Sequence, residues 1–278
     1  MADQFCNGEK RRALPVKVWT LVENTACRED LRAEHGLSLY IETGDHKLLF
    51  DAGQSGAFAD NAEKLGVDLS RVDMAILSHG HYDHGGGWRR FLEINSAAPV
   101  YLNRNAFQPH YNGADKYIGL DPALAESGRL VFVDDELRLG EGIALHSCNA
   151  YQPPYPADPC GLKVLEDGKL RPEDFRHEQY LLIRENGKKI LFSGCSHKGI
   201  GNIVHWFRPD VLIGGFHFLK LDPAGTGAKT LENAARYLSG YPTTYYTCHC
   251  TGKAQYAFLK ARMGSRLHAL SAGSVLEI

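Results

Sequence analysis

The chain has 278 residues, of which 44% are hydrophobic and 23% charged, close to the averages of soluble globular proteins. Lys and Arg number 31 against 33 Asp and Glu, so the overall charge excludes a general attraction to nucleic acid or to an anionic membrane. The longest apolar run, residues 211–219, is about half as long as a membrane span. Residues 1–15 resemble neither a signal peptide nor a transit peptide. We therefore expect a cytoplasmic protein that binds no nucleic acid and no membrane, and the oligomeric state stays open.

The N-terminal half predicts a β-meander followed by a strand, a helix and a strand. Thr43, Gly44 and Asp45 are typical of a hairpin turn between two β-like segments. The apolar run at residues 72–78 indicates a buried strand. The predicted strands are 16–23, 36–42, 46–53, 72–78 and 99–103, and the predicted helices are 56–65 and 88–94.

The second half repeats this pattern, beginning with a hairpin whose turn is Asn186 and Gly187. Residues 104–175 are the least regular part, and 149–160 carry too many prolines for a helix or a strand, which predicts a surface loop or a lid. No composition break suggests a linker, so we expect one domain over 1–278. The predicted strands are 130–133, 143–147, 179–194 as a hairpin, 210–216, 245–250 and 267–278 as a closing hairpin or strand pair, and the predicted helices are 200–207, 230–238 and 252–263.

Four candidate metal ligands follow the strand that ends near residue 78, namely His79, His81, Asp83 and His84. Imidazole and carboxylate groups are ligands of zinc, iron and manganese. His79 and His81 can reach one ion as the chain leaves the strand, while Asp83 and His84 on the next turn can reach a second. The following glycines let the backbone pass close to the ions. The segment predicts one or two divalent ions, with zinc favoured over iron or manganese.

These residues carry a resemblance to a known family. HGHYDH at 79–84 resembles the HxHxDH signature of the metallo-β-lactamase superfamily, and KLLFDAG, which contains Asp51, resembles its first motif. The resemblance implies an α/β, four-layer sandwich of helices, mixed sheet, mixed sheet and helices, with the metal site at one edge. Segments at 193–203, 214–218 and 247–252 are similar to the 7,8-dihydropterin-6-yl-methyl-4-(β-D-ribofuranosyl)aminobenzene 5'-phosphate synthase branch.

The same resemblance implies roles for individual residues. The first metal would be bound by His79 and His81, and the second by Asp83, His84 and His249. Cys195 stands where many members of the superfamily have a bridging Asp, so its thiolate would be a further ligand. Asp51 would orient the ligand loop through hydrogen bonds.

The chain departs from the family at the third motif, where a His is expected before the hairpin. It offers His177 and Glu178 side by side, and we favour Glu178 as a ligand or a catalytic base, with His177 behind it. Asp83 is predicted to be catalytic as well as metal-binding. His197 and His217 follow apolar strands at the same edge, so they are either catalytic residues that contact substrate or transfer a proton, or satisfied core histidines.

The remaining histidines and two cysteines are assigned to structural places. Cys248 and Cys250 flank His249 in a predicted strand, so their side chains should point away from the face that His249 uses. Seven cysteines at irregular spacing favour reduced thiols. The histidines without ligand spacing are expected at the surface or in packing, namely His35, His46, His110, His146, His205 and His268.

Three segments, after residues 79, 195 and 249, run from strand to ligand to glycine to helix. Three helix N-termini should therefore converge and attract an anion, with Lys198 and Lys253 binding it. We expect a metal-dependent hydrolase or transferase that acts on a small anionic substrate, phosphorylated and pterin-like, through a metal-activated water or a metal-stabilised leaving group. Two alternatives stay open: a ligand- or redox-cofactor-binding protein whose metal is structural or senses redox state through Cys195, and a broad small-molecule esterase or lactamase.

Overall fold

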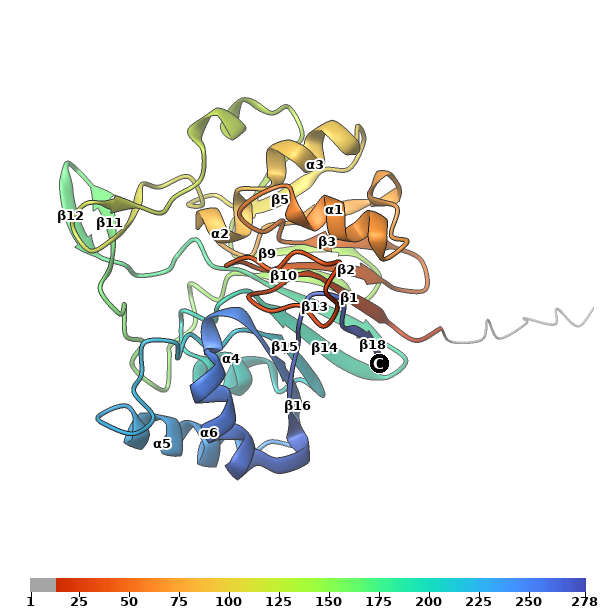
Figure 1. Cartoon of the computed structure of the whole chain (residues 1–278). Helices are drawn as coiled ribbons and strands as arrows, with labels where there is room; N and C mark the ends of the chain where they lie inside the picture. The colour runs from red at the N-terminus through yellow and green to blue at the C-terminus, as the bar shows by residue number, and fades with distance from the viewer. Residues whose placement is uncertain (1–13) are drawn as a thin grey trace, which may run out of the picture.

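The computed structural model describes residues 14–278. Residues 1–13 lie outside the described part. They include Cys6 and most of residues 1–15, the segment predicted to be neither a signal peptide nor a transit peptide. Two seven-stranded sheets face each other and carry helices on their outer faces (Figure 1). This arrangement confirms the predicted four-layer order. None of the helices in the described part combines the length and apolar character needed to span a bilayer.

The first sheet is mixed. Its strands β1 to β3 pair antiparallel, and β3, β4, β5 and β8 run parallel. In spatial order the strands are β18 (Val275–Glu277), β1 (Lys17–Val22), β2 (Ser38–Glu42), β3 (Lys47–Phe50), β4 (Met74–Ile76), β5 (Val100–Asn103) and β8 (Leu130–Val133). The helices α1 (Ala57–Lys64) and α3 (Trp88–Ile94) lie on its outer face.

The second sheet is mixed in the same way, with β14, β15, β16 and β17 parallel and the remaining pairs antiparallel. Its outer face is covered by α4 (Ile200–Phe207), α5 (Ala228–Ser239) and α6 (Lys253–Met263). In spatial order the strands are β17 (Leu267–Ala269), β16 (Thr244–Thr247), β15 (Val211–Gly214), β14 (Lys188–Ser193), β13 (Tyr180–Glu185), β10 (Ile143–His146) and β9 (Glu136–Gly140).

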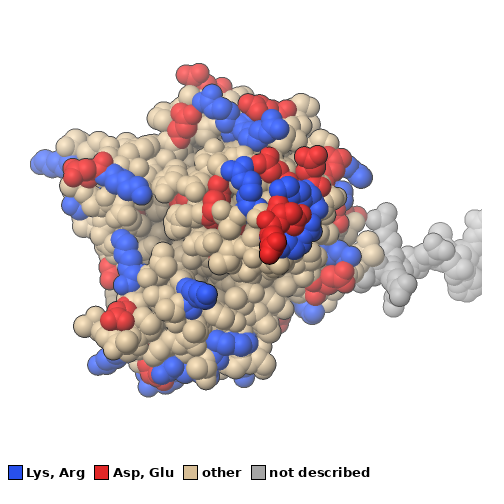
Figure 2. Space-filling view, in the orientation of Figure 1, with Lys and Arg blue, Asp and Glu red and all other residues tan. Residues whose placement is uncertain are grey.

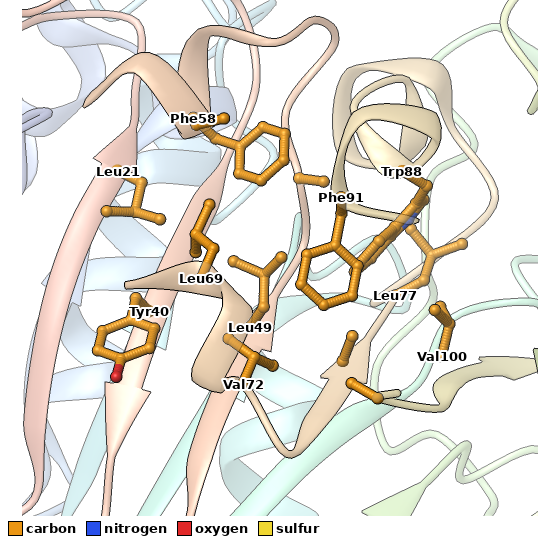
Figure 3. Close-up of a cluster of buried hydrophobic side chains, with 14 of the residues drawn as sticks. Leu21, Tyr40, Leu49, Phe58, Leu69, Val72, Leu77, Trp88, Phe91 and Val100 are labelled. Carbon is orange, nitrogen blue, oxygen red and sulfur yellow. The ribbon is translucent and has the colours of Figure 1, made fainter. Parts of the chain in front are cut away.

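Strand alternation explains why the sheets form layers. Successive side chains of a strand point to opposite faces, so Leu48 and Phe50 pack between the sheets while Leu49 packs under the outer helices. On β14, Phe192 lies between the sheets and Leu191 contacts the helices of the second sheet. Figure 3 shows the cluster between the first sheet and its helices, where Phe58 and Phe91 close over Leu49. The predicted apolar runs therefore form strands that are buried on both faces.

A third, four-stranded sheet was not expected from the sequence. It lies within residues 104–175, which are predicted to be irregular, and it projects beside α2 (Tyr82–Gly85) at one end of the molecule (Figure 1). All four residues of one strand and both residues of another are exposed, so no alternating pattern marks them. In order its strands are β12 (Lys169–Pro172), β11 (Leu162–Glu166), β6 (His110–Asn112) and β7 (Lys116–Tyr117).

The C-terminal segment also differs from its prediction. Residues 267–278 do not form a hairpin, because β17 joins the second sheet while β18 pairs antiparallel with β1 in the first. The turn at Ser271 to Gly273 carries the chain from one sheet to the other. Residues 149–160 form neither helix nor strand, as predicted. Short 3-10 turns occur at Leu69–Arg71, Pro122–Glu126, His249–Thr251 and Gly264–Arg266.

The surface mixes both signs of charge. Figure 2 shows Lys and Arg side chains interspersed with Asp and Glu over the visible face. The six cysteines in residues 14–278 are all free thiols, as their spacing predicts.

Candidate metal centre

The candidate ligands lie at the carboxyl ends of strands from both sheets. Asp51 follows β3 and His79 follows β4, while Cys195 and His249 follow β14 and β16 shortly after each strand ends. Because parallel strands end at the same edge of a sheet, these side chains meet at one rim of the sandwich, where α/β proteins commonly place their sites. This placement brings together all six residues predicted as ligands, His79, His81, Asp83, His84, Cys195 and His249.

Asp51 fixes the orientation of two of these histidines. Its Oδ1 accepts the backbone N–H of Ser78 at 2.7 Å, and its Oδ2 accepts the Ser78 hydroxyl and Nδ1 of His84, both at 2.7 Å. The Ser78 hydroxyl gives its only proton to Asp51, so its oxygen must accept from Nδ1 of His79 at 2.8 Å. When neutral, both histidines therefore carry their proton on Nδ1, and their Nε2 atoms face the site with a free lone pair.

His249 is oriented from a different part of the chain. Its Nδ1 donates to the Asn24 side-chain oxygen at 2.9 Å, and its backbone N–H donates to Glu23 at 2.7 Å. The Nε2 atom then lies 3.2 Å from Oδ2 of Asp83, and His35 approaches the same oxygen at 3.3 Å. Glu23 and Asn24 are residues that sequence reasoning missed, because nothing in their local pattern marks a contact with a residue more than 200 positions away.

Two pairs of candidate ligand atoms meet across the site at hydrogen-bond distance. His84 Nε2 is 3.3 Å from the Cys195 sulfur, and His79 Nε2 is 3.3 Å from His197 Nε2. Each pair can share at most one proton, and His197 still has a buried Nδ1 without a partner. Two facing lone pairs in a buried site repel each other, so such a pair is stabilised by a cation between them. A metal ion can take the place of the shared proton.

The donor set fits divalent ions in groups of three. One atom each of His79, His81 and His197 lie within 4.8 Å of one another, and the same holds for His79, His84 and Cys195. A third group consists of His35, Asp83 and His249, and Asp83 is 4.0 Å from Nε2 of His84. Imidazole with thiolate is typical of zinc, and imidazole with carboxylate suits zinc or iron.

A pocket opens directly onto these groups. Its wall includes Asp83, Cys195 and His249 from the candidate centre. His217 also lines it, with its ring centroid 4.2 Å from that of His197. Burial is the main cause that lowers the pKa of His217 to about 4, so its ring is neutral at pH 7. The outer wall is formed by Tyr82, Asn112, Lys116, Ile118, Leu162, Leu219 and Lys220.

Glu178, predicted to be a ligand or a base, makes structural contacts instead. Its Oε1 accepts the backbone N–H of His197 at 2.7 Å, and its Oε2 accepts the N–H of Lys198 at 3.0 Å and the Tyr180 hydroxyl at 2.6 Å. With both oxygens occupied, Glu178 holds the loop that carries Cys195 and His197. The neighbouring residue His177 lies against the histidines of the site, with its ring centroid 5.2 Å from that of His81.

The prediction that Lys198 and Lys253 bind the substrate anion is also not supported. Lys198 is buried, and its ammonium donates to Ser147 O at 2.6 Å and to the Asn149 side chain at 2.7 Å. Lys253 begins α6 and lines a neighbouring hollow with Glu23 and Asn24. Neither lysine is among the described residues that line the central pocket.

Cys250 does not point away from the site as predicted. Strand β16 ends at Thr247, and His249 has φ +48°, so the alternation of a strand does not continue through residue 250. The Cys250 sulfur accepts the backbone N–H of His217 at 3.3 Å and lines the pocket. Cys248 packs between the two sheets, in agreement with its predicted role.

Two histidines assigned to surface or packing lie next to the candidate ligands: His35 has a half-exposed side chain, and His110 is packed in the interior, so both assignments hold although their neighbours were not foreseen. His35 approaches Asp83, and His110 is completely buried beside His177, with the ring centroids 4.0 Å apart. Both come from segments without ligand spacing, so no local signal could have identified them. Ser78, in contrast, directly precedes His79 and could have been recognised as its hydrogen-bond partner.

We expect the metal-free protein to lose stability as the pH falls from 7 to 5. Burial, followed by repulsion from neighbouring histidines, holds the pKa values of His79, His81, His177 and His197 well below their ordinary value. The unfolded chain therefore binds more protons below about pH 6.5, and each such histidine costs up to about 1.4 kcal/mol per pH unit below that value. His84 acts in the opposite direction, because Asp51 and Asp83 outweigh its burial and raise its pKa. Thermal unfolding in the presence of a chelator measures the net effect, and a constant melting temperature between pH 7 and 5 would contradict it.

Comparisons with known proteins agree with this geometry. The sequence matches the family model of the metallo-beta-lactamase superfamily over residues 31–222. It is 30% identical to an uncharacterized protein of Methanocaldococcus jannaschii, covering 84% of this chain and 89% of that one. It is 28% identical to the 7,8-dihydropterin-6-methyl-4-(beta-D-ribofuranosyl)-aminobenzene-5'-phosphate synthase of the same organism, covering 94% and 96%.

Solved structures show the same likeness. One described as a metal-dependent hydrolase of the beta-lactamase superfamily superposes with a TM-score of 0.78 at 28% identity, covering 95% of this chain and 99% of that one. PqqB from Methylobacterium extorquens gives a TM-score of 0.57 at 12% identity, covering 94% and 100%. At this lower identity the likeness concerns the fold alone.

Proposed function

Since this chain belongs to the metallo-beta-lactamase superfamily, we propose that it is a metal-dependent hydrolase or transferase that acts on a small anionic compound. The observation that carries the proposal is the pair of Nε2 atoms of His79 and His84, which face the site while hydrogen bonds hold their Nδ1 atoms, each Nε2 lying 3.3 Å from a further candidate ligand atom. The 28% identity to a dihydropterin phosphate synthase supports a phosphorylated, pterin-like substrate.

The proposed metal ligands fall into two sets. His79, His81 and His197 would hold one ion, and Asp83, His84, Cys195 and His249 a second. Here His197 replaces the third-motif residue that the sequence leaves in doubt. When bound, such ions supply Lewis acidity and a water that ionises near neutral pH.

Other groups of the chain orient and enclose the substrate. His217 stays neutral above about pH 4, so its ring can accept a hydrogen bond from substrate or water at the pocket wall. The side chains of Ile118, Leu162 and Leu219 make part of the outer wall apolar. Such a wall excludes bulk water and strengthens polar contacts inside the pocket.

Two lysines at the pocket are the better candidates for the anion. Lys116 has its ammonium 5.7 Å from the centre of the Tyr82 ring, and Lys220 donates to the carbonyl of Cys160 at 2.8 Å. Asp83, already engaged with His249 and His35, is the one carboxylate among the described lining residues. The outer pocket is therefore positive where the substrate enters, and we assign to Lys116 and Lys220 the role first predicted for Lys198 and Lys253.

Lys116→Met and Lys220→Met are each expected to raise KM for a phosphorylated substrate about 5- to 20-fold, with little change in kcat. The estimate takes about 1–2 kcal/mol for a charge-assisted contact, reduced because both side chains are partly in solvent. Lys253→Met, outside the pocket, is the matched control. Steady-state kinetics would contradict the assignment if the control raised KM as much as the two pocket variants.

The proposed function is tested by metal removal and reconstitution. The chelated protein should regain activity towards phosphate esters or a phosphorylated pterin on addition of zinc, iron or manganese, with one or two ions per chain by elemental analysis. Asp83→Ala should lower this stoichiometry. A protein that binds metal without turning over any ester would favour the structural or redox-sensing alternative, and faster cleavage of neutral esters would favour the esterase alternative. Absence of metal binding would refute the proposal.

A further inference from the structure

The small sheet presents a row of three side chains to the pocket at the metal centre. Strand register places Leu162 of β11 opposite Asn112 of β6, and Asn112 opposite Lys116 of β7. Directly opposed residues point to the same face of a sheet, and all three of these side chains line the pocket. The row therefore changes along its length from an apolar group to an amide and then to an ammonium group.

Lys220 reaches the same side of the pocket from a different part of the chain. Its ammonium donates to the Cys160 carbonyl at 2.8 Å. Burial and then the charge of Lys220 lower the pKa of His217, another residue of the pocket wall. An ammonium group has three N–H donors, so two remain for a ligand. The next carbonyl, that of Gly161, accepts the backbone N–H of Gly113 at 3.1 Å, which ties this segment to the small sheet.

The polar groups at this end of the pocket lack partners of their own. Within residues 14–278 neither ammonium forms an ion pair with a carboxylate, and the side chain of Asn112 makes no hydrogen bond. Other exposed cations, such as Arg89 and Arg104, are paired with aspartates. Two unpaired cations beside a free amide are typical of a site that binds an anion through charge-assisted hydrogen bonds.

These groups lie at the outer end of the pocket. The proposed metal ligands are buried, and Asp83, the most exposed of them, is only 9% exposed. Asn112, Lys116 and Lys220 are all exposed. The pocket has a volume of about 190 Å³, less than the roughly 300–1,000 Å³ of sites that enclose a drug-sized ligand. It can therefore enclose one end of a phosphorylated ring compound, while the other end lies at the rim.

We propose that Asn112, Lys116 and Lys220 bind the phosphate of the substrate as a recognition group, and that the bond that reacts lies at the other end, beside the metal ligands. The phosphate then remains on the product, with none of its P–O bonds broken. This inference rests on the proposed function, because it assigns which end of the substrate faces the metal centre. Asn112 is a specificity-determining residue, since its amide N–H₂ group donates to a phosphate oxygen, and Leu162 contacts the apolar part between the two ends.

The phosphate subsite can be measured without metal. Inorganic phosphate should bind to the chelated full-length protein in isothermal titration calorimetry, and acetate should bind more weakly because it carries a single charge. Asn112→Asp, which keeps the shape but adds a negative charge, should lower phosphate affinity about 10-fold or more, and Lys116→Met about 5- to 20-fold. Lys163→Met is the matched control, because Lys163 follows Leu162 in β11 and points to the opposite face of the small sheet.

The zinc-loaded protein provides a second measurement. Phosphorus NMR spectra of any phosphorylated compound that it turns over should show the phosphate still attached to the product. Release of inorganic phosphate as a product would overturn the inference. It would also be overturned if the chelated protein bound no phosphate at millimolar concentration, bound acetate more tightly, or kept its phosphate affinity in Asn112→Asp. If that variant fails to fold, Lys116→Met and the product spectra decide.

Failure of the proposed function gives a different pattern. The zinc-loaded protein would then turn over no compound, while the chelated protein would still bind phosphate and lose it in Asn112→Asp.

Discussion

Asp51→Asn is expected to lower the affinity for a divalent ion by about 100- to 10,000-fold while leaving the fold intact. The carboxylate of Asp51 only accepts hydrogen bonds, and it receives them from Ser78 and His84. An amide at this position must direct its N–H₂ group towards some of these partners. Loss of one supporting contact typically costs 10- to 100-fold in metal affinity, and two ligands depend on this carboxylate.

The substitution acts by changing which ring nitrogen of His79 and of His84 carries the proton. If the new amide donates to the Ser78 hydroxyl and to Nδ1 of His84, the hydroxyl proton turns towards His79, and both histidines take their own proton on Nε2. The atoms that should bind the ion are then blocked. Ser78→Ala removes only the link to His79, so we expect a smaller loss, about 10-fold. Chelator competition with zinc or cobalt measures both variants, and wild-type affinity in Asp51→Asn would show that Asp51 does not set these protons.

Phe192→Ala is expected to reduce the free energy of unfolding by about 3–5 kcal/mol, the usual cost of removing a large aromatic ring from a close-packed core. Phe192 is fully buried between the two sheets, and its ring centroid is 6.0 Å from that of Phe50 on the facing sheet. The sheets cannot close over the resulting cavity without shifting the strands that end at the metal centre.

The control is Phe132→Ala on β8, whose side chain is 42% exposed, and we expect it to cost less than about 1 kcal/mol. Urea denaturation of the metal-free proteins compares the two variants. Equal losses would mean that the space between the sheets is not the main source of stability.

The sequence reveals those parts of the centre whose ligands are close neighbours along the chain. His79, His81, Asp83 and His84 fall within one turn after a buried strand, so their spacing alone predicts a shared site. The residues that orient these ligands are set by tertiary contacts. Asn24 meets His249 across 225 positions, and no periodicity records such a contact.

Errors arise where the backbone leaves a regular path. Cys250 is misplaced because His249 adopts a left-handed conformation that the strand pattern does not anticipate. Glu178 and His177 are neighbours, and a register shift of one residue exchanges which of the two faces the histidines. The sequence does not determine this register. The strands of the main sheets are predicted well because their apolar residues recur along each strand, whereas the exposed strands of the small sheet lack such a pattern.

The separation of β17 and β18 into different sheets affects the order of assembly during synthesis. Residue 17 pairs with residue 277, so one edge of β1 stays open until residues 275–277 have left the ribosome. Glu23 and Asn24, just beyond β1, likewise cannot form their hydrogen bonds with His249 until that residue has been synthesised. The N-terminal half can therefore collapse early, but its outer strand gains its neighbour only when the newest part of the chain arrives. A nascent chain stalled before that point would expose an unpaired strand edge, the kind of surface that chaperones protect from aggregation.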